Sequence, residues 1–185
     1  MKTAPAAVAA ALTLALAITA CGSSPRRAAT PSGVLPATAV AGLAVVTRPL
    51  TGQAVQKDAS VPHLAARLAG WGYMGGWQRT FQGESRRLTL VVSRSLRFRT
   101  SPGAAAFVTF MHQNAGRFYP FALTSRLRLP GRSGWLIRPP LCSCHMATPL
   151  LVGVIAKGRS VSWLEINGPQ ASTRLLSGLL ARTPT

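Results

Sequence analysis

The pattern of hydrophobic and polar positions predicts seven β-strands between residues 40 and 166. Residues 88–98 show the pattern most clearly, because apolar side chains occupy every second position and Arg94 is the one interruption. Alternation of this kind is typical of a half-buried strand. The other predicted strands are residues 40–46, 77–81, 123–129, 135–137, 150–156 and 161–166. Short turns that contain glycine separate neighbouring strands and predict antiparallel pairing.

Apolar residues recur at helical spacing in three further segments. These are residues 60–70, residues 101–116 and a last segment that begins near Pro169. Capping residues or proline open each segment, and a glycine closes the first two. Helices placed between hairpins indicate an α+β fold. The sequence therefore predicts a single α+β domain over residues 40–183, with an antiparallel sheet and about three helices.

The N-terminal end carries one charge, Lys2, followed by an apolar stretch over residues 6–19. The stretch is short and rich in alanine, whereas a transmembrane helix needs about 20 strongly apolar residues. Arg26 and Arg27 follow on the side that would cross the membrane, which disfavours a permanent span. We therefore expect residues 1–20 to be a secretory signal peptide that is removed.

Residues 18–21, Ile-Thr-Ala-Cys, resemble the lipobox of bacterial lipoproteins. The resemblance implies a diacylglyceryl thioether on Cys21 and anchoring of the chain at the extracytoplasmic face of the cell membrane. An ordinary signal peptide with an incidental cysteine is the alternative. Residues 21–38 lack periodicity and are rich in proline, glycine and serine, so we expect a lipidated cysteine followed by a flexible linker.

The order of the predicted elements resembles that of PsbP-type proteins and of many small exported bacterial lipoproteins. The order is one strand, one helix, two strands, one helix, four strands and one helix. Residues 98–104, Phe-Arg-Thr-Ser-Pro-Gly-Ala, lead into the second helix. Such domains are mostly binding or assembly modules without a shared active site. The resemblance therefore implies a binding role and no particular chemistry.

The chain is strongly basic, with 21 Lys and Arg against 3 Asp and Glu and a net charge of +18. Removal of Lys2 with the signal peptide leaves 20 basic side chains and a net charge of 20 − 3 = +17. Codon bias can exchange Lys for Arg, but it does not remove Asp and Glu, so the acid depletion is a property of the protein. This charge either only keeps the surface solvated or attracts an anionic partner.

Export limits which anionic partners the chain can meet. We expect membrane attachment through the N-terminal lipid, with anionic lipid, a wall polymer or an envelope protein as further partners, and no nucleic acid. Arg97 and Arg99 share one face of their predicted strand. Arg126 and Arg128 share one face of another. We predict that these four arginines form a basic sheet surface that binds anions.

Few side chains could perform catalysis. The chain has three carboxylates, Asp58, Glu84 and Glu165, and three histidines. A paired-carboxylate or Ser-His-Asp site would need nearly all of them, and no Gly-Xaa-Ser-Xaa-Gly motif occurs. Residues 70–75 have the glycine spacing of a dinucleotide-binding loop, but they follow a predicted helix and enter a strand, which is the wrong order. We therefore predict no enzymatic activity and no cofactor.

One segment is dense in reactive groups: Cys142, Ser143, Cys144, His145 and Met146. With Cys21 lipidated, Cys142 and Cys144 could form a disulfide, although a ring this small would be strained and easily reduced. Free or intermolecular thiols are a second interpretation. Thiolate, imidazole and thioether also suit Cu(I), so Cys142, Cys144, His145 and Met146 form a candidate metal site. The predicted function is thus a membrane-anchored, non-enzymatic binding or assembly module, and the alternative is a thiol or copper-handling envelope lipoprotein.

Overall fold

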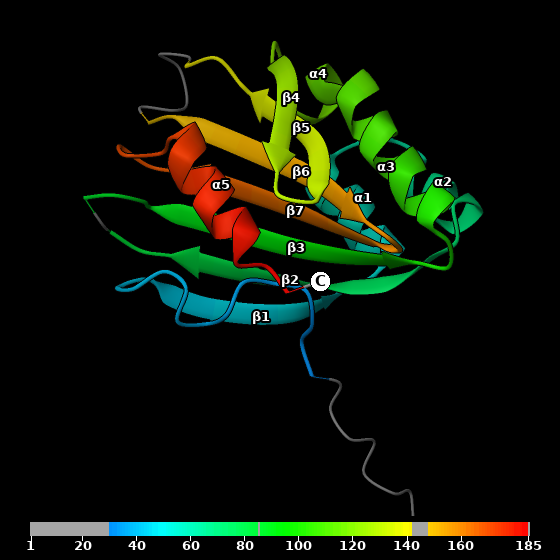
Figure 1. Cartoon of the computed structure of the whole chain (residues 1–185), viewed down its shortest axis with the longest axis horizontal. Helices are drawn as coiled ribbons and strands as arrows, with labels where there is room; N and C mark the ends of the chain where they lie inside the picture. The colour runs from blue at the N-terminus through cyan, green and yellow to red at the C-terminus, as the bar shows by residue number, and fades with distance from the viewer. Residues whose placement is uncertain (1–29, 85, 142–147, 185) are drawn as a thin grey trace, which may run out of the picture.

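The computed structural model describes residues 30–84, 86–141 and 148–184. In these residues, seven strands form one antiparallel sheet in the order β1-β2-β3-β7-β6-β5-β4 (Figure 1). The strands are β1 (Ala44–Leu50), β2 (Tyr73–Gln82), β3 (Leu90–Phe98), β4 (Leu123–Leu129), β5 (Arg132–Arg138), β6 (Leu150–Lys157) and β7 (Ser160–Asn167). The predicted α+β domain with an antiparallel sheet is confirmed.

The part of the chain that the structure describes contains five helices. They are α1 (Gly52–Ala59), α2 (Leu64–Gly70), α3 (Ser101–Gln113), α4 (Ala115–Phe118) and α5 (Thr173–Ala181). Helices α1 to α4 cover one face of the sheet and α5 covers the other (Figure 1). The sequence predicted α2, α3 and α5. It missed the single turn α4 and the short helix α1, which buries only Val55 and Ala59 and is capped by the Thr51 hydroxyl.

Strand β1 differs from its prediction because it lies at an edge of the sheet. It was predicted over residues 40–46 and to end before Pro49, but it spans Ala44–Leu50 and includes that proline. An edge strand pairs on one side only, so a residue without an N–H group is tolerated there. Proline was therefore a misleading stop signal.

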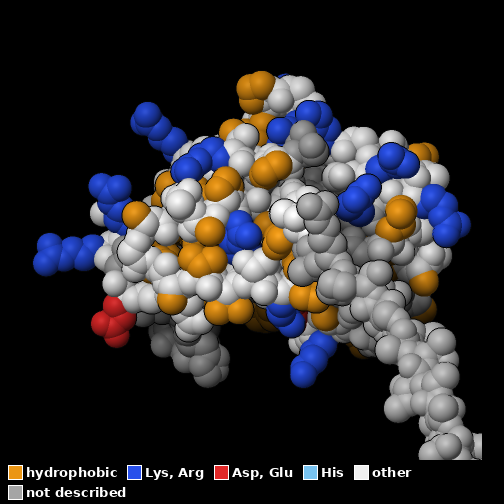
Figure 2. Space-filling view, turned by 90° about the horizontal axis from the view of Figure 1, so that it is seen from below, with side chains coloured by type: hydrophobic (Ala, Val, Ile, Leu, Met, Phe, Trp, Pro, Cys, Tyr) orange, Lys and Arg blue, Asp and Glu red, His pale blue; other side chains and the backbone are white. Residues whose placement is uncertain are grey.

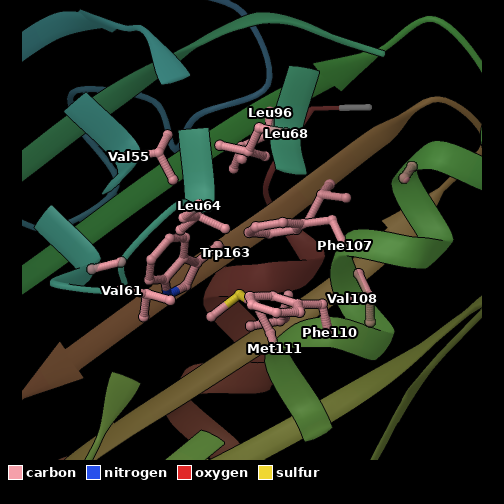
Figure 3. Close-up of a cluster of buried hydrophobic side chains, with 14 of the residues drawn as sticks. Val55, Val61, Leu64, Leu68, Leu96, Phe107, Val108, Phe110, Met111 and Trp163 are labelled. Carbon is pink, nitrogen blue, oxygen red and sulfur yellow. The ribbon is translucent and has the colours of Figure 1, made fainter. Parts of the chain in front are cut away.

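The core has two layers, one on each face of the sheet. Under α1 to α4, the side chains of Val55, Leu64 and Phe107 converge on Trp163 from β7 (Figure 3). The Phe107 and Trp163 ring centroids lie 6.2 Å apart. On the other face, leucines of α5 pack against β3, β6 and β7.

The segment before β1 belongs to the domain. Val34 and Leu35 are 3% and 0% exposed. The Leu35 N–H donates to Ser93 Oγ at 3.0 Å, and Arg79 Nη1 donates to the Leu35 carbonyl at 2.6 Å. The predicted boundary is therefore corrected: the domain begins before residue 40, and the linker predicted through residue 38 ends earlier. The linker-like composition concealed two buried apolar residues, of which Leu35 packs into the α5 side of the core.

No helix in the described ranges is long and apolar enough to cross a membrane. The segment from residue 32 to residue 43 runs over the α5 face of the sheet, because Leu35 contacts Ser93 and Gly33 lies against Ser95. The chain that leads back to Cys21 therefore leaves the domain on the α5 face.

We predict that Leu35→Ala lowers the free energy of unfolding by about 2–5 kcal/mol, because it removes a fully buried side chain. Thr38→Ala, at an exposed position three residues later, is the control and changes it by less than about 0.5 kcal/mol. Denaturant titration of the two variants measures both values. If Leu35→Ala unfolds at the same denaturant concentration as the wild type, residues 32–38 are a linker after all.

Candidate functional site

Two of the three carboxylates of the chain are engaged by arginine. Asp58 forms an ion pair with Arg48 at 2.5 Å, and Glu165 forms one with Arg94 at 2.5 Å. Glu84 is exposed in the turn between β2 and β3. Basic side chains stand out over the face seen in Figure 2, whereas acidic ones are rare on it. The surface therefore has little negative charge to balance its arginines.

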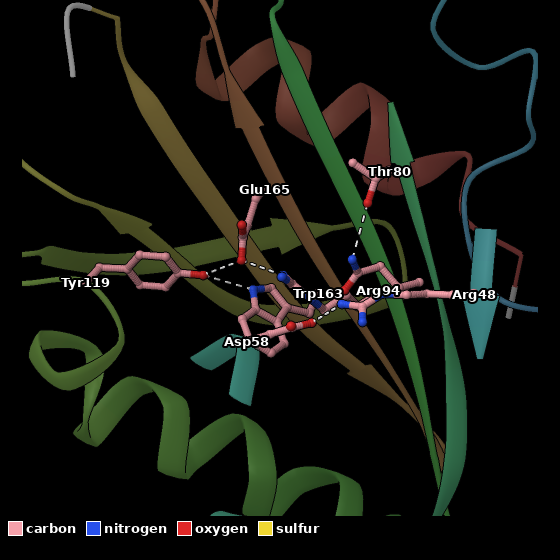
Figure 4. A network of polar contacts seen from close by, with 8 residues as sticks. Arg48, Asp58, Thr80, Arg94, Tyr119, Trp163 and Glu165 are labelled. Carbon is pink, nitrogen blue, oxygen red and sulfur yellow. Dashed lines mark hydrogen bonds and ion pairs between the residues drawn. The ribbon is translucent and has the colours of Figure 1, made fainter. Parts of the chain in front are cut away.

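A buried polar network lies on the sheet face that carries α1 to α4 (Figure 4). Arg94, on β3, is 7% exposed. Its Nε donates to Gln78 Oε1 at 2.8 Å, its Nη1 donates to Glu165, and its guanidinium carbon lies 4.2 Å from the centroid of the Trp163 ring. Gln78, Arg94 and Trp163 are cross-strand neighbours on β2, β3 and β7. The sheet register thus places Gln78 and Trp163 beside the guanidinium, and Glu165 lies two residues beyond Trp163 on β7.

Tyr119, just after α4, joins the helical layer to this network. Its hydroxyl donates to Glu165 Oε1 at 2.6 Å and accepts from Trp163 Nε1 at 3.1 Å. Burial, together with the negative charge of Glu165, raises the pKa of Tyr119 well above its ordinary value. Tyr119 is therefore a neutral donor at physiological pH. The network connects two layers of the fold, which is a structural role.

The four predicted anion-binding arginines do not share a surface. Arg97 follows Leu96, whose side chain packs under α1 to α4, so Arg97 points to the α5 side. Leu127 packs on the α5 side, so Arg126 and Arg128 point to the opposite side. Three strands also separate β3 from β4.

The prediction of one basic sheet surface, made of Arg97, Arg99, Arg126 and Arg128, is therefore wrong. Alternation predicts which side chains of one strand share a face, but it does not predict which strands are neighbours in the sheet. Arg126 instead lies over Trp135 at 4.0 Å, and the His112 ring stacks on Trp135 with the centroids 3.4 Å apart. Arg97 lines a hollow of about 280 Å³ together with Ser32, Ser95 and Ser160.

A different set of arginines gathers beside α5. Two adjoining hollows of about 470 and 210 Å³ share Arg87, Leu175, Leu179 and Arg182, so we describe them as one groove, the α5 groove. The wider part is lined by Gln170, Ser172, Arg174 and Gly178 in addition, and the narrower part by Ala39, Val40, Ala41 and Leu88. Its lining thus contains three arginines and no carboxylate.

Three segments build the α5 groove. The Ser172 hydroxyl caps α5 by accepting from the Leu175 N–H at 3.3 Å. The Gln170 N–H donates to the Arg87 carbonyl at 3.0 Å. This bond holds the segment before α5 against the segment that leads into β3. Arg182 Nη1 donates to the Ala39 carbonyl at 3.2 Å and so links the end of α5 to the segment before β1.

The α5 groove is not predictable from local sequence patterns, because its arginines are far apart in the chain. Arg87 comes from the end of the β2–β3 connection, whereas Arg174 and Arg182 lie at the two ends of α5. One sequence signal was available: the first turn of α5 contains Arg174 and no acidic residue. Helices usually place acids there, so this turn is unusually positive.

The cysteine-containing predictions lie outside the described residues. This applies to the lipidation of Cys21, to the disulfide between Cys142 and Cys144, and to the metal site with His145 and Met146. All three stay predictions. In the ranges that are described, no group of three or more His, Cys, Asp or Glu could hold a metal ion.

We predict that Glu165→Gln lowers the free energy of unfolding by about 3–5 kcal/mol, because the Arg94 charge stays buried without its counterion. Asp58→Asn removes the carboxylate of the more exposed Arg48–Asp58 pair and lowers the free energy of unfolding by about 0–1 kcal/mol. Thermal and denaturant unfolding of both variants measure the difference. Equal losses would show that the Arg94 pair is no more than a surface interaction.

Comparison with known proteins assigns no family to the chain. No family model matches the sequence, and no curated protein matches it. Among solved structures, the extracellular domain of PknH from Mycobacterium tuberculosis is similar, with a TM-score of 0.46 and 13% sequence identity. The similarity covers 75% of this chain and 79% of that domain. A likeness at this level carries no argument about function.

Proposed function

We propose that this chain is a lipid-anchored domain on the extracytoplasmic face of the cell membrane, with a non-enzymatic binding role. Its partner is an anionic component of the envelope: a phospholipid surface, a wall polymer or a protein that presents acidic groups. The observation that carries the proposal is the imbalance of exposed charge. Asp58 and Glu165 are both held by arginines, and the α5 groove gathers three further arginines without a carboxylate.

Electrostatic attraction at a membrane supports this role. Each Lys or Arg near an anionic bilayer contributes about 1 kcal/mol, and the attraction falls off within about 10 Å at moderate salt. Exposed arginines occur on both faces of the sheet, for example Arg97 and Arg128. Only a domain held near the surface benefits from such short-range attraction. A lipid on Cys21, as the lipobox resemblance implies, would hold it there.

The engagement of the carboxylates also supports a binding role over catalysis. General acid-base chemistry needs a titratable group that is accessible to substrate. Glu165 is held by Arg94 and Tyr119, and Asp58 is held by Arg48. Of the two described histidines, His112 is stacked on Trp135, and exposed His63 precedes α2. Few groups are left for such chemistry.

The test uses the full chain, anchored through its own N-terminus in nanodiscs of neutral phosphatidylcholine. We expect these discs to sediment with phosphatidylglycerol vesicles and with wall fragments, but not with phosphatidylcholine vesicles. Raising the salt concentration weakens the association, because the Debye length shrinks. Replacing Arg87, Arg97, Arg174 and Arg182, which lie on the α5 side, by Glu weakens it more than about tenfold, whereas replacing them by Lys has little effect.

Two outcomes would contradict the proposal. One is association that is equal for neutral and anionic vesicles and is insensitive to salt. The other is association that survives the four Glu substitutions unchanged, because eight units of charge would then have no effect.

A further inference from the structure

We propose that the α5 groove binds one anionic phospholipid, with the phosphate head group on its arginines and part of an acyl chain in its narrower part. This inference deepens the proposed function and rests on it. It names the site and the chemical class of ligand. It also makes the domain a lipid-binding module in addition to a surface-adsorbing one.

The charge of the wider part fits a phosphate. Arg87, Arg174 and Arg182 line it, and none of its lining residues is acidic. Arginine binds phosphate through parallel N–H donors, which gives both strength and direction. The N-terminal end of α5, with Ser172 as its cap, opens into the same part and adds partial positive charge. A monoanionic or dianionic head group is therefore complementary to this region.

The narrower part fits an alkyl chain better than water or a free ion. It has a volume of about 210 Å³. Arg87 and Arg182 line it where it adjoins the wider part, and the remaining lining is apolar: Ala39, Val40, Ala41, Leu88, Leu175 and Leu179. Leu88 and Leu179 are each 4% exposed, so they form a floor, while Leu175 is half-buried at the rim. Inorganic phosphate would use the arginines but leave this apolar slot in contact with water. A ligand with a charged head and an apolar tail fills both parts.

The position of the groove matches a ligand that comes from the membrane. Residues 39–41 form one wall of the slot, and they belong to the segment that leads back toward Cys21. Only eight residues lie between Cys21 and Thr30, so the nine Cα-to-Cα steps that join them span at most about 30 Å. The chain leaves the domain on the α5 face, as Leu35 and Ser93 establish. A lipid anchor on Cys21 therefore holds Thr30 within about 30 Å of the bilayer, and the chain reaches Thr30 from the face that carries the groove.

The experiment uses native mass spectrometry of the full chain in a neutral detergent. Phosphatidylglycerol is titrated into the protein, and phosphatidylcholine with the same acyl chains and inorganic phosphate are titrated in parallel. We expect one bound phosphatidylglycerol per chain, with at least about tenfold weaker binding of phosphatidylcholine. Inorganic phosphate competes only at concentrations far above that of the lipid.

Variants locate the ligand. A triple substitution of Arg87, Arg174 and Arg182 by Gln weakens phosphatidylglycerol binding more than about tenfold. The matched control replaces Arg99, Arg117 and Arg128 by Gln, which removes the same charge at exposed positions away from the groove, and weakens binding less than about threefold. Leu175→Asn tests the slot without a change of charge and also weakens binding. Thermal unfolding of each variant confirms that it is folded.

The outcomes separate this inference from the proposed function. If the two arginine triple variants lost phosphatidylglycerol binding equally, or if Leu175→Asn bound it as the wild type does, the α5 groove would not be the lipid site. The proposed adsorption through overall charge would then still stand. Inorganic phosphate that competes as well as the lipid would overturn the acyl-chain assignment. If the wild-type chain does not associate with anionic vesicles in the sedimentation test, the proposed function itself is wrong.

Discussion

The ion pair between Arg94 and Glu165 is the interaction on which the rest of the structure depends. An arginine that is 7% exposed in the middle of a sheet face is unfavourable unless its charge and its donors are matched. Glu165 supplies the charge, Gln78 accepts a further hydrogen bond, and Trp163 offers its ring face. Tyr119 then ties the same carboxylate to the end of the α3–α4 layer. Removing Glu165 would leave this arrangement without a counterion.

The use of carboxylates in internal pairs leaves the surface of the molecule strongly basic. A chain with three carboxylates that holds one of them inside, and a second against Arg48, has little left to offset its exposed arginines. The α5 groove is where that imbalance coincides with an apolar floor and with the face from which the chain leads to Cys21. Internal stability and external charge are thus linked through a small number of acidic residues. The proposed binding role follows from that link.

Local patterns predicted most elements, and long-range relations account for the errors. Alternation and helical spacing located β3, β4, β6 and β7 and the helices α2, α3 and α5, because these elements bury one face or stripe. The same alternation marked Arg94 as an interruption. It did not identify Glu165 as the partner, because 71 residues separate the two. Local alternation also does not predict the order of the strands in the sheet, which is why Arg97 and Arg126 were assigned to one surface. The α5 groove was missed because Arg87 and Arg182 meet only in the folded chain.

The most direct test of the account is amide hydrogen exchange of the full chain in the presence of nanodiscs, compared between phosphatidylcholine alone and phosphatidylcholine mixed with phosphatidylglycerol. The account predicts slower exchange in the anionic discs for α5 and for residues 36–41, with β4 and β5 unchanged. Identical exchange in the two kinds of disc, or protection confined to β4 and β5, would contradict the claim that the α5 face meets an anionic membrane surface.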